Sequence, residues 1–242
     1  GLTYVPPDPC ACYPEAKLTG FNALSSAQSS VNAREDQDPL VKGPAYQAQT
    51  QPGNNAGEEE WPTYRHDMSR SGYVQTRLPE KLETHWNTPL GGELTSLVLS
   101  NNTIYVARKN IHTLYALDAS NGKQKWHFTA GGRIDSPPSI VKGRVIFGSA
   151  DGWVYCLDES SGSLAWKFHA APNDQKIVSH GQLESLWPVS GSVLVRNGEV
   201  WFVSGRSMFL DSGLYLYRLN ATTGEEISRT HMDNINPQTG DD

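Results

Sequence analysis

The feature that most constrains the fold of this chain is a segment that returns at a fixed spacing. The stretch "LYALDASNGKQKW" (114–126) is followed forty residues later by "VYCLDESSGSLAW" (154–166), and the Trp at 86 keeps the same interval. A weaker copy, "LYRLNATTGEEIS", occupies 216–228. Self-similarity at a period of this length is typical of repeat architectures.

Each repeat has the pattern of short β-strands. Runs rich in β-branched and aromatic residues recur at 103–107, 144–150 and 199–205, and each follows a turn signal such as Asn197-Gly198. No segment combines a long helical period with helix caps. The pattern therefore predicts an all-β fold, a β-propeller built of four-stranded antiparallel blades that stack radially.

The chain is too short for a large closed ring. Eight blades of this length would take roughly 320 residues, against 242 present. We therefore expect an incomplete propeller of about three to four blades within residues 61–242, with an outer strand at 82–88. The expected units are about 82–129, 130–169 and 170–231. The polar last residues, "NPQTGDD", favour a fragment of a longer protein.

The repeated motif has a mechanical interpretation. Asp118 begins a turn in which its carboxylate can accept backbone N–H groups, and Gly122 supplies the positive φ of that turn. Trp126 offers a large ring to the neighbouring blade, and its indole N–H needs an acceptor. A catalytic Asp would have to recur on every blade, so we predict packing between blades. The predicted docking residues are Trp86, Asp118, Gly122, Trp126, Asp158, Gly162, Trp166, Asn220 and Gly224.

The two strong copies resemble the A-x-D-x-x-x-G-x-x-x-W tryptophan-docking repeat of PQQ-type (pyrroloquinoline-quinone-type) quinoprotein propellers, including the outer-membrane assembly lipoprotein type. The segment "EWPTYRHDMSRSGY" (60–73) is similar to the one that opens many such propellers. The resemblance covers residues 61–231 and implies a periplasmic or extracytoplasmic protein. The third copy departs from it, because Asn220 replaces Asp and Ser228 replaces Trp, so its outer contact is expected to be atypical.

The first sixty residues interrupt the repeat. Residues 2–7 and 17–25 have strand patterns, and we interpret 1–26 as the remnant of an earlier blade. Residues 27–60 are rich in Ser, Gln, Asn, Gly and Pro and indicate a polar linker or surface insertion. Either one continuous propeller carries this insertion, or an earlier propeller ends near 26 and a new one begins at Trp61. We favour the continuous propeller.

Candidate ligand residues lie where the repeats differ. The inner strands begin with Thr95, Asp135 and Glu184, which would meet at one rim of the channel as solvated charges or as a site for a cation or polar ligand. The third unit is also about twenty residues longer between Trp166 and Gly198, and long loops on a rigid scaffold often carry function. The further candidates are His180, Trp187, Arg206 and Asp211.

Several function classes are disfavoured. The net charge is −6 without a basic cluster, so we expect no nucleic-acid partner. No apolar run approaches the roughly 18 residues of a transmembrane helix. No nucleophile elbow, phosphate loop, dinucleotide fingerprint or zinc-protease motif occurs. Cys10 and Cys12 lack the second pair of a zinc site, and with Cys156 they indicate ordinary thiols or a local disulfide.

Three functions fit these observations. The favoured one is a non-catalytic scaffold or protein-interaction module that needs no cofactor and no catalytic or metal-ligating residue. The second is a sensor of a small polar ligand or carbohydrate, fused to an enzyme elsewhere in the full chain. The third, implied by the resemblance, is a dehydrogenase that uses PQQ with calcium. Alcohol dehydrogenases of that family carry two adjacent cysteines over the quinone, whereas Ala11 separates Cys10 from Cys12 here.

Overall fold

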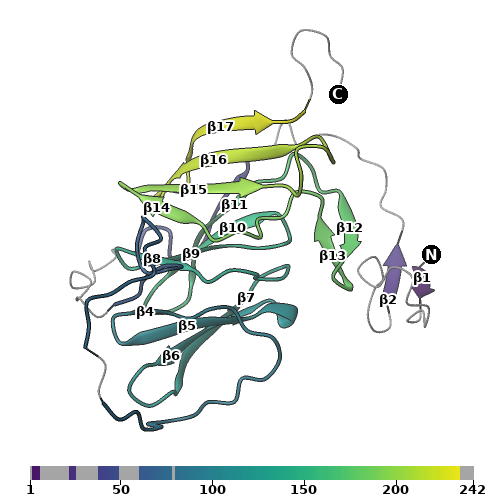
Figure 1. The fold of residues 1–242 in the computed structure, drawn as a ribbon. Coiled ribbons are helices and arrows are strands. Elements are labelled where there is room, and N and C mark those ends of the chain that lie inside the picture. Colours follow the sequence, from purple (N-terminus) through teal and green to yellow (C-terminus); the bar gives the residue numbers. More distant parts are fainter. Residues whose placement is uncertain (1, 6–21, 26–37, 49–59, 78–79, 235–242) are drawn as a thin grey trace.

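Three antiparallel sheets, two of four strands and one of five, form the body of the chain. The computed structural model describes residues 2–5, 22–25, 38–48, 60–77 and 80–234, and Figure 1 shows the sheets stacked one above another. Within each sheet the four strands of one blade follow chain order, and the middle sheet carries one further strand from earlier in the chain. The stack is an incomplete β-propeller, as predicted.

The strands of the three blades have the following bounds. The first blade holds β4 (Val98–Ser100), β5 (Thr103–Arg108), β6 (Thr113–Asp118) and β7 (Gln124–Thr129). The second holds β8 (Ser139–Val141), β9 (Arg144–Gly148), β10 (Trp153–Asp158) and β11 (Leu164–His169). The third holds β14 (Leu194–Arg196), β15 (Glu199–Ser204), β16 (Leu214–Asn220) and β17 (Glu226–Met232). The innermost strands are therefore β4, β8 and β14.

Shorter elements surround the blades. A single 3-10 turn, η2 (Lys109–Ile111), is the only helical element among the described residues. Strands β12 (Lys176–Ser179) and β13 (Gln182–Ser185) form a hairpin in the longer third unit. Strands β1 (Leu2–Val5) and β2 (Asn22–Ser25) pair antiparallel, which confirms the prediction of two strands near the N-terminus. That they are the remnant of an earlier blade stays a prediction. Within the described ranges, no helix has the length and hydropathy needed to span a bilayer.

Two structural details differ from the simple repeat. In the segment expected to be a linker or surface insertion, β3 (Leu40–Lys42) pairs with β11 as a fifth strand on the outer edge of the second blade. The prediction of an outer strand at 82–88 is wrong, because the structure has no strand there. Trp86 nevertheless docks, and its Nε1 donates to the carbonyl oxygen of Ala119 at 2.8 Å. The docking contact therefore does not require that the Trp lie in a paired strand.

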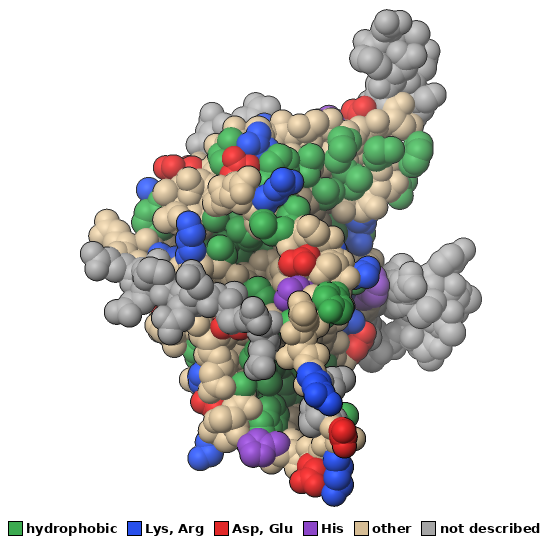
Figure 2. Space-filling model, turned by 60° about the vertical axis from the view of Figure 1, so that its left-hand side comes forward, with side chains coloured by type: hydrophobic (Ala, Val, Ile, Leu, Met, Phe, Trp, Pro, Cys, Tyr) green, Lys and Arg blue, Asp and Glu red, His purple; other side chains and the backbone are tan. Residues whose placement is uncertain are grey.

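Two apolar cores join the blades. One core lies between the first and second blades and contains Tyr105, Trp126 and Phe147, and the other joins the second and third blades around Trp166 and Tyr217. All five residues of β9 are buried because both faces of its sheet are covered. The third blade differs: Val200 and Phe202 point into the core, whereas Val203 is 40% exposed on the opposite face. Figure 2 shows apolar side chains gathered over this upper part of the molecule.

The repeated motif forms the predicted turn and clasp. Asp118 Oδ1 accepts the backbone N–H of Ser120 at 2.8 Å, and Asp158 Oδ1 accepts that of Ser161 at 3.0 Å. Trp126 Nε1 donates to the carbonyl oxygen of Glu159 on the next blade at 2.9 Å. The ring of Trp126 covers the turn that contains Gly162. The motif therefore joins each blade to the next.

The clasp of Trp166 on the third blade differs from the other two, while the atypical outer contact expected at Ser228 stays a prediction. Asn220 Oδ1 replaces the carboxylate and accepts the N–H groups of Thr222 and Thr223 at 2.9 and 3.0 Å. The fully buried ring of Trp166 packs on Gly224, but its Nε1 has no hydrogen-bond partner in the described part of the chain. This clasp therefore depends on ring packing alone.

Two glycine-to-alanine substitutions distinguish two contributions to stability. One is the cost of a left-handed backbone in a turn, and the other is the contact between the turn and the docking Trp. Gly162 has φ +70°, and a Cβ there would lie 2.6 Å from Cδ2 of Trp126, whereas Gly198 has φ +80° and open space around it. We expect Gly198→Ala to cost about 1 kcal/mol for its left-handed backbone. Gly162→Ala should cost about 1–3 kcal/mol more because the Trp126 ring must move. Urea unfolding of both variants measures the difference, and equal losses would show that no ring presses on Gly162.

Candidate functional site

Four charged residues and one histidine form a network at the N-terminal ends of the inner strands. This rim cluster consists of Arg133, Asp135, His180, Glu184 and Arg206. The first two precede β8, Glu184 lies in β13, and Arg206 follows β15. The chain fold therefore brings together four of the sequence candidates and adds Arg133, which the sequence analysis did not identify.

Glu184 is the centre of the rim cluster. Its side chain is 2% exposed, and its two carboxylate oxygens are bound by different arginines. Arg133 Nη1 donates to Oε1, and Arg206 Nη2 donates to Oε2 at 2.7 Å. The ring of His180 is 59% exposed, and its Nδ1 lies 3.7 Å from Oε1. Both oxygens of this carboxylate are therefore used within the protein.

Arg133 also binds Asp135 through two parallel hydrogen bonds. Its Nε donates to Oδ1 at 2.8 Å and its Nη2 donates to Oδ2 at 2.9 Å. Burial alone would lower the pKa of Arg133, but the hydrogen bonds and negative charges of Asp135 and Glu184 outweigh it and raise that pKa. Arg133 therefore stays charged, and Asp135 and Glu184 compensate its charge.

The longer third unit fastens this rim to the other blades. Gln182 Nε2 donates to the carbonyl oxygen of Asn110 at 2.9 Å, and its Oε1 lies 2.8 Å from His112 Nε2. The β12–β13 hairpin therefore reaches the first blade. The buried Trp187 donates from Nε1 to the carbonyl oxygen of Asp211 at 2.7 Å. Trp187 and Asp211, both sequence candidates, thus hold the loop between β15 and β16.

A polar hollow adjoins the rim cluster. It has a volume of about 390 Å³, and Thr95, Lys109 and Asp135 are among its lining residues. Thr95 is buried, and its Oγ1 donates to the carbonyl oxygen of Ser96 and accepts the N–H of Ala107, both at 3.0 Å. The structure thus places Thr95 beside Asp135, outside the ion-pair network. The binding of a small polar ligand or carbohydrate at this hollow stays a prediction.

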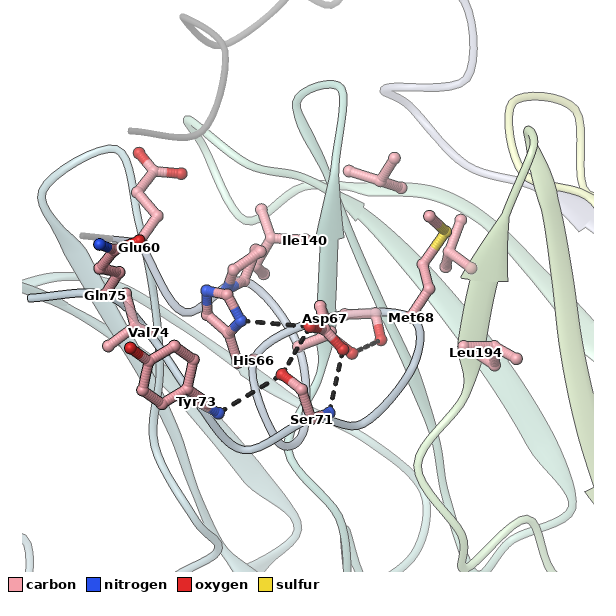
Figure 3. A pocket seen from close by; sticks show the side chains of 15 residues that line it. Glu60, His66, Asp67, Met68, Ser71, Tyr73, Val74, Gln75, Ile140 and Leu194 are labelled. Carbon is pink, nitrogen blue, oxygen red and sulfur yellow. Dashed lines mark hydrogen bonds and ion pairs between the residues drawn. The ribbon is translucent and has the colours of Figure 1, made fainter. Parts of the chain in front are cut away.

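A larger groove lies along the inner edges of β8 and β14. This inner-edge groove has a volume of about 730 Å³ and is lined by residues of the segment 60–75 together with β8 and β14. In Figure 3, Tyr73 and Met68 lie on opposite sides of the groove, with Asp67 between them. Tyr73 is 67% exposed and Met68 is 53% exposed. The groove therefore presents apolar side chains to the outside.

One carboxylate stays ionised in this groove. Ser71 donates to Asp67 from Oγ at 2.6 Å and from its backbone N–H at 3.0 Å. These hydrogen bonds lower the pKa of Asp67 to about 2. A second carboxylate, Glu60, accepts the backbone N–H of Asn101 at 3.0 Å. No Lys or Arg is among the lining residues, so the groove combines an apolar surface with negative charge.

The cysteines and metal-binding groups add no catalytic arrangement among the described residues. Cys156 is fully buried, and burial raises the pKa of its thiol. Cys10 and Cys12 lie outside the described residues. Across the described ranges, no group of three His, Cys, Asp or Glu side chains is placed to hold a metal ion.

The relatives found by comparison with known proteins include dehydrogenases and assembly factors. The quinone-dependent alcohol dehydrogenase subunit of Gluconobacter oxydans is 25% identical over 84% of this chain and 28% of its own length. The outer membrane protein assembly factor BamB of Yersinia pestis is 27% identical over 67% of this chain and 40% of its own length. The chain therefore spans less than half of either relative.

The solved structure of quinohemoprotein alcohol dehydrogenase from Comamonas testosteroni has the same fold. It superimposes with a TM-score of 0.57 at 22% identity and covers 78% of this chain and 29% of that protein. A family model described as outer membrane protein assembly factor BamB matches residues 54–234, well over half of the chain. The chain therefore belongs to the PQQ-like β-propeller family of that description.

Proposed function

We propose that this chain is a non-catalytic PQQ-like propeller that acts as a scaffold or protein-interaction module in an extracytoplasmic compartment. The observation that supports it is the contrast between the rim cluster and the inner-edge groove. At the rim, the carboxylates of Asp135 and Glu184 are bound by Arg133 and Arg206. The inner-edge groove, of about 730 Å³, presents apolar side chains to solvent. Apolar concave surfaces with few polar groups are typical of binding sites.

A PQQ-dependent dehydrogenase is the second candidate. The similarity to the Gluconobacter oxydans subunit favours it, because that alignment covers more of this chain than the BamB alignment does. Calcium prefers six to eight oxygen ligands, with carboxylates prominent among them. The rim does not fit such an ion, because the two oxygens of Glu184 and the two of Asp135 already accept hydrogen bonds from arginines. A calcium ion there would have to displace the three ion pairs that these carboxylates form with Arg133 and Arg206.

Reconstitution with cofactor distinguishes the two functions. The full-length protein is incubated with PQQ and calcium, freed of unbound quinone by gel filtration and scanned for quinone absorbance, with a known quinoprotein dehydrogenase as the positive control. We expect no retained quinone and no reduction of an electron-accepting dye when an alcohol is added. Stoichiometric, calcium-dependent retention of PQQ would overturn the proposed function in favour of the dehydrogenase.

A further inference from the structure

The protein already uses the inner edges of two blades to bind extended polypeptide. Trp61 pairs with Leu99 at the edge of β4, with N–H···O distances of 2.9 and 2.8 Å in the two directions. The backbone N–H of Ile140 in β8 donates to the carbonyl oxygen of Pro62 at 2.8 Å. The segment that begins at residue 60 thus adds main-chain hydrogen bonds to the first blade and then to the second.

The inner edge of the third blade has no such partner in the described part of the chain. Strand β14 is the first strand of its sheet, and only β15 pairs with it. The segment 60–75 reaches this blade through Arg70, whose Nη2 lies 3.4 Å from the carbonyl oxygens of Ser192 and Val193, just before β14. An edge strand presents free N–H and C=O groups that can pair with another chain.

The inner-edge groove adjoins this free edge and restricts what can bind there. Leu194 and Val195 of β14 line the groove together with Met68 and Tyr73. The charged side chains of the lining are acidic: Asp67 is ionised because Ser71 hydrogen-bonds its carboxylate, and Glu60 lies in the same lining. An extended peptide that alternates apolar and basic residues would match both the apolar walls and the negative charge.

We propose that the inner-edge groove binds an extended segment of a partner protein, in which apolar and basic residues alternate, as an added strand on the edge of β14. This inference rests on the proposed interaction function and names the chemistry of its partner. Main-chain hydrogen bonds to β14 supply affinity that does not depend on sequence. The apolar contacts of Met68 and Tyr73 and the charge of Asp67 select the peptide.

The test uses a fluorescently labelled Lys-Val-Lys-Val-Lys-Val peptide and the full-length protein, with anisotropy as the readout. We expect saturable binding that weakens with added salt, and no binding of the Glu-Val-Glu-Val-Glu-Val peptide. Asp67→Asn should weaken binding about fivefold, since it removes the charge but keeps the size of the side chain and one oxygen that can accept the backbone N–H of Ser71. Tyr73→Ala should weaken it about tenfold. Leu97→Ala, an exposed apolar residue outside the groove, is the matched control and should bind as the parent does.

Two N-methylated peptides test the strand pairing itself. Methylation of the valine amides blocks one edge of the extended peptide, and methylation of the lysine amides blocks the other. Strand addition predicts that one of the two peptides loses binding while the other keeps it.

Three results would overturn the inference: no binding, equal binding of the Lys-Val and Glu-Val peptides, or equal effects of Tyr73→Ala and Leu97→Ala. Met68→Ala repeats the test if Tyr73→Ala melts at a lower temperature than the parent. Failure here would leave the proposed function standing, because PQQ reconstitution measures cofactor retention and does not depend on peptide binding.

Discussion

Trp126→Ala is expected to lower the free energy of unfolding by about 3–5 kcal/mol, the range for truncation of a buried aromatic side chain. The ring of Trp126 is 9% exposed and belongs to the core between the first and second blades. Its centroid lies 5.8 Å from that of Tyr105, and its Nε1 donates to Glu159 on the next blade. The substitution removes these contacts and leaves the carbonyl group of Glu159 without that donor. Urea unfolding followed by circular dichroism measures the loss.

Two variants control for this result. Trp126→Phe keeps most of the apolar area and loses the hydrogen bond, so its loss should be clearly smaller than that of Trp126→Ala. Tyr73→Ala removes an aromatic ring that is 67% exposed and should change the stability by less than about 0.5 kcal/mol. A loss well under about 1 kcal/mol for Trp126→Ala would contradict the docking role of the repeated motif.

Glu184→Ala is expected to destabilise the chain by about 3–5 kcal/mol, because it removes the carboxylate that pairs with both the buried Arg133 and the partly buried Arg206. The side chain of Arg133 is 5% exposed and that of Arg206 is 23% exposed, so neither guanidinium can fully regain water without a local rearrangement. Arg133 retains Asp135, whereas Arg206 retains only neutral acceptors on Ser179 and Ser185. Thermal and urea unfolding measure the effect.

The matched control is a surface ion pair. Glu83 and Lys81 are 75% and 85% exposed, so Glu83→Ala should cause no measurable loss of stability. Glu184→Gln keeps an amide oxygen that one arginine can use, and we expect it to lie between the parent and Glu184→Ala. Equal stability of Glu184→Ala and Glu83→Ala would mean that the rim cluster does not hold the blades together.

The sequence is sufficient to predict the blades because their contacts repeat. Trp126 docks on a turn that recurs at a fixed interval in the sequence. The repeated motif is therefore enough to predict which residues of neighbouring blades are in contact. The strand expected at 82–88 fails for a physical reason. A strand needs a neighbour to satisfy its backbone groups, and none of the described strands lies beside residues 82–88, although Trp86 still finds its acceptor.

The candidate site is predicted only in part. Asp135, Glu184 and Arg206 stand out because the repeats differ there, yet Arg133 joins them across fifty-one residues of sequence. The only local sequence feature that places Arg133 with Asp135 is their spacing of two residues, because alternate residues of an extended segment lie on the same face. The inner-edge groove has no periodic signal at all. Its segment turns through residues with positive φ, including Arg65, His66 and Arg70, which sequence patterns do not identify.

The most direct measurement is a pair of amide chemical-shift titrations on one isotope-labelled sample of the full-length protein. The central claim is that the groove binds a partner while the rim holds blades together. The claim predicts that the Lys-Val peptide shifts the amide signals of Asp67, Tyr73 and Val195, and that PQQ with calcium leaves those of Arg133, Glu184 and Arg206 unchanged. Saturable shifts of the rim signals with PQQ and calcium, and none in the groove with the peptide, would contradict it.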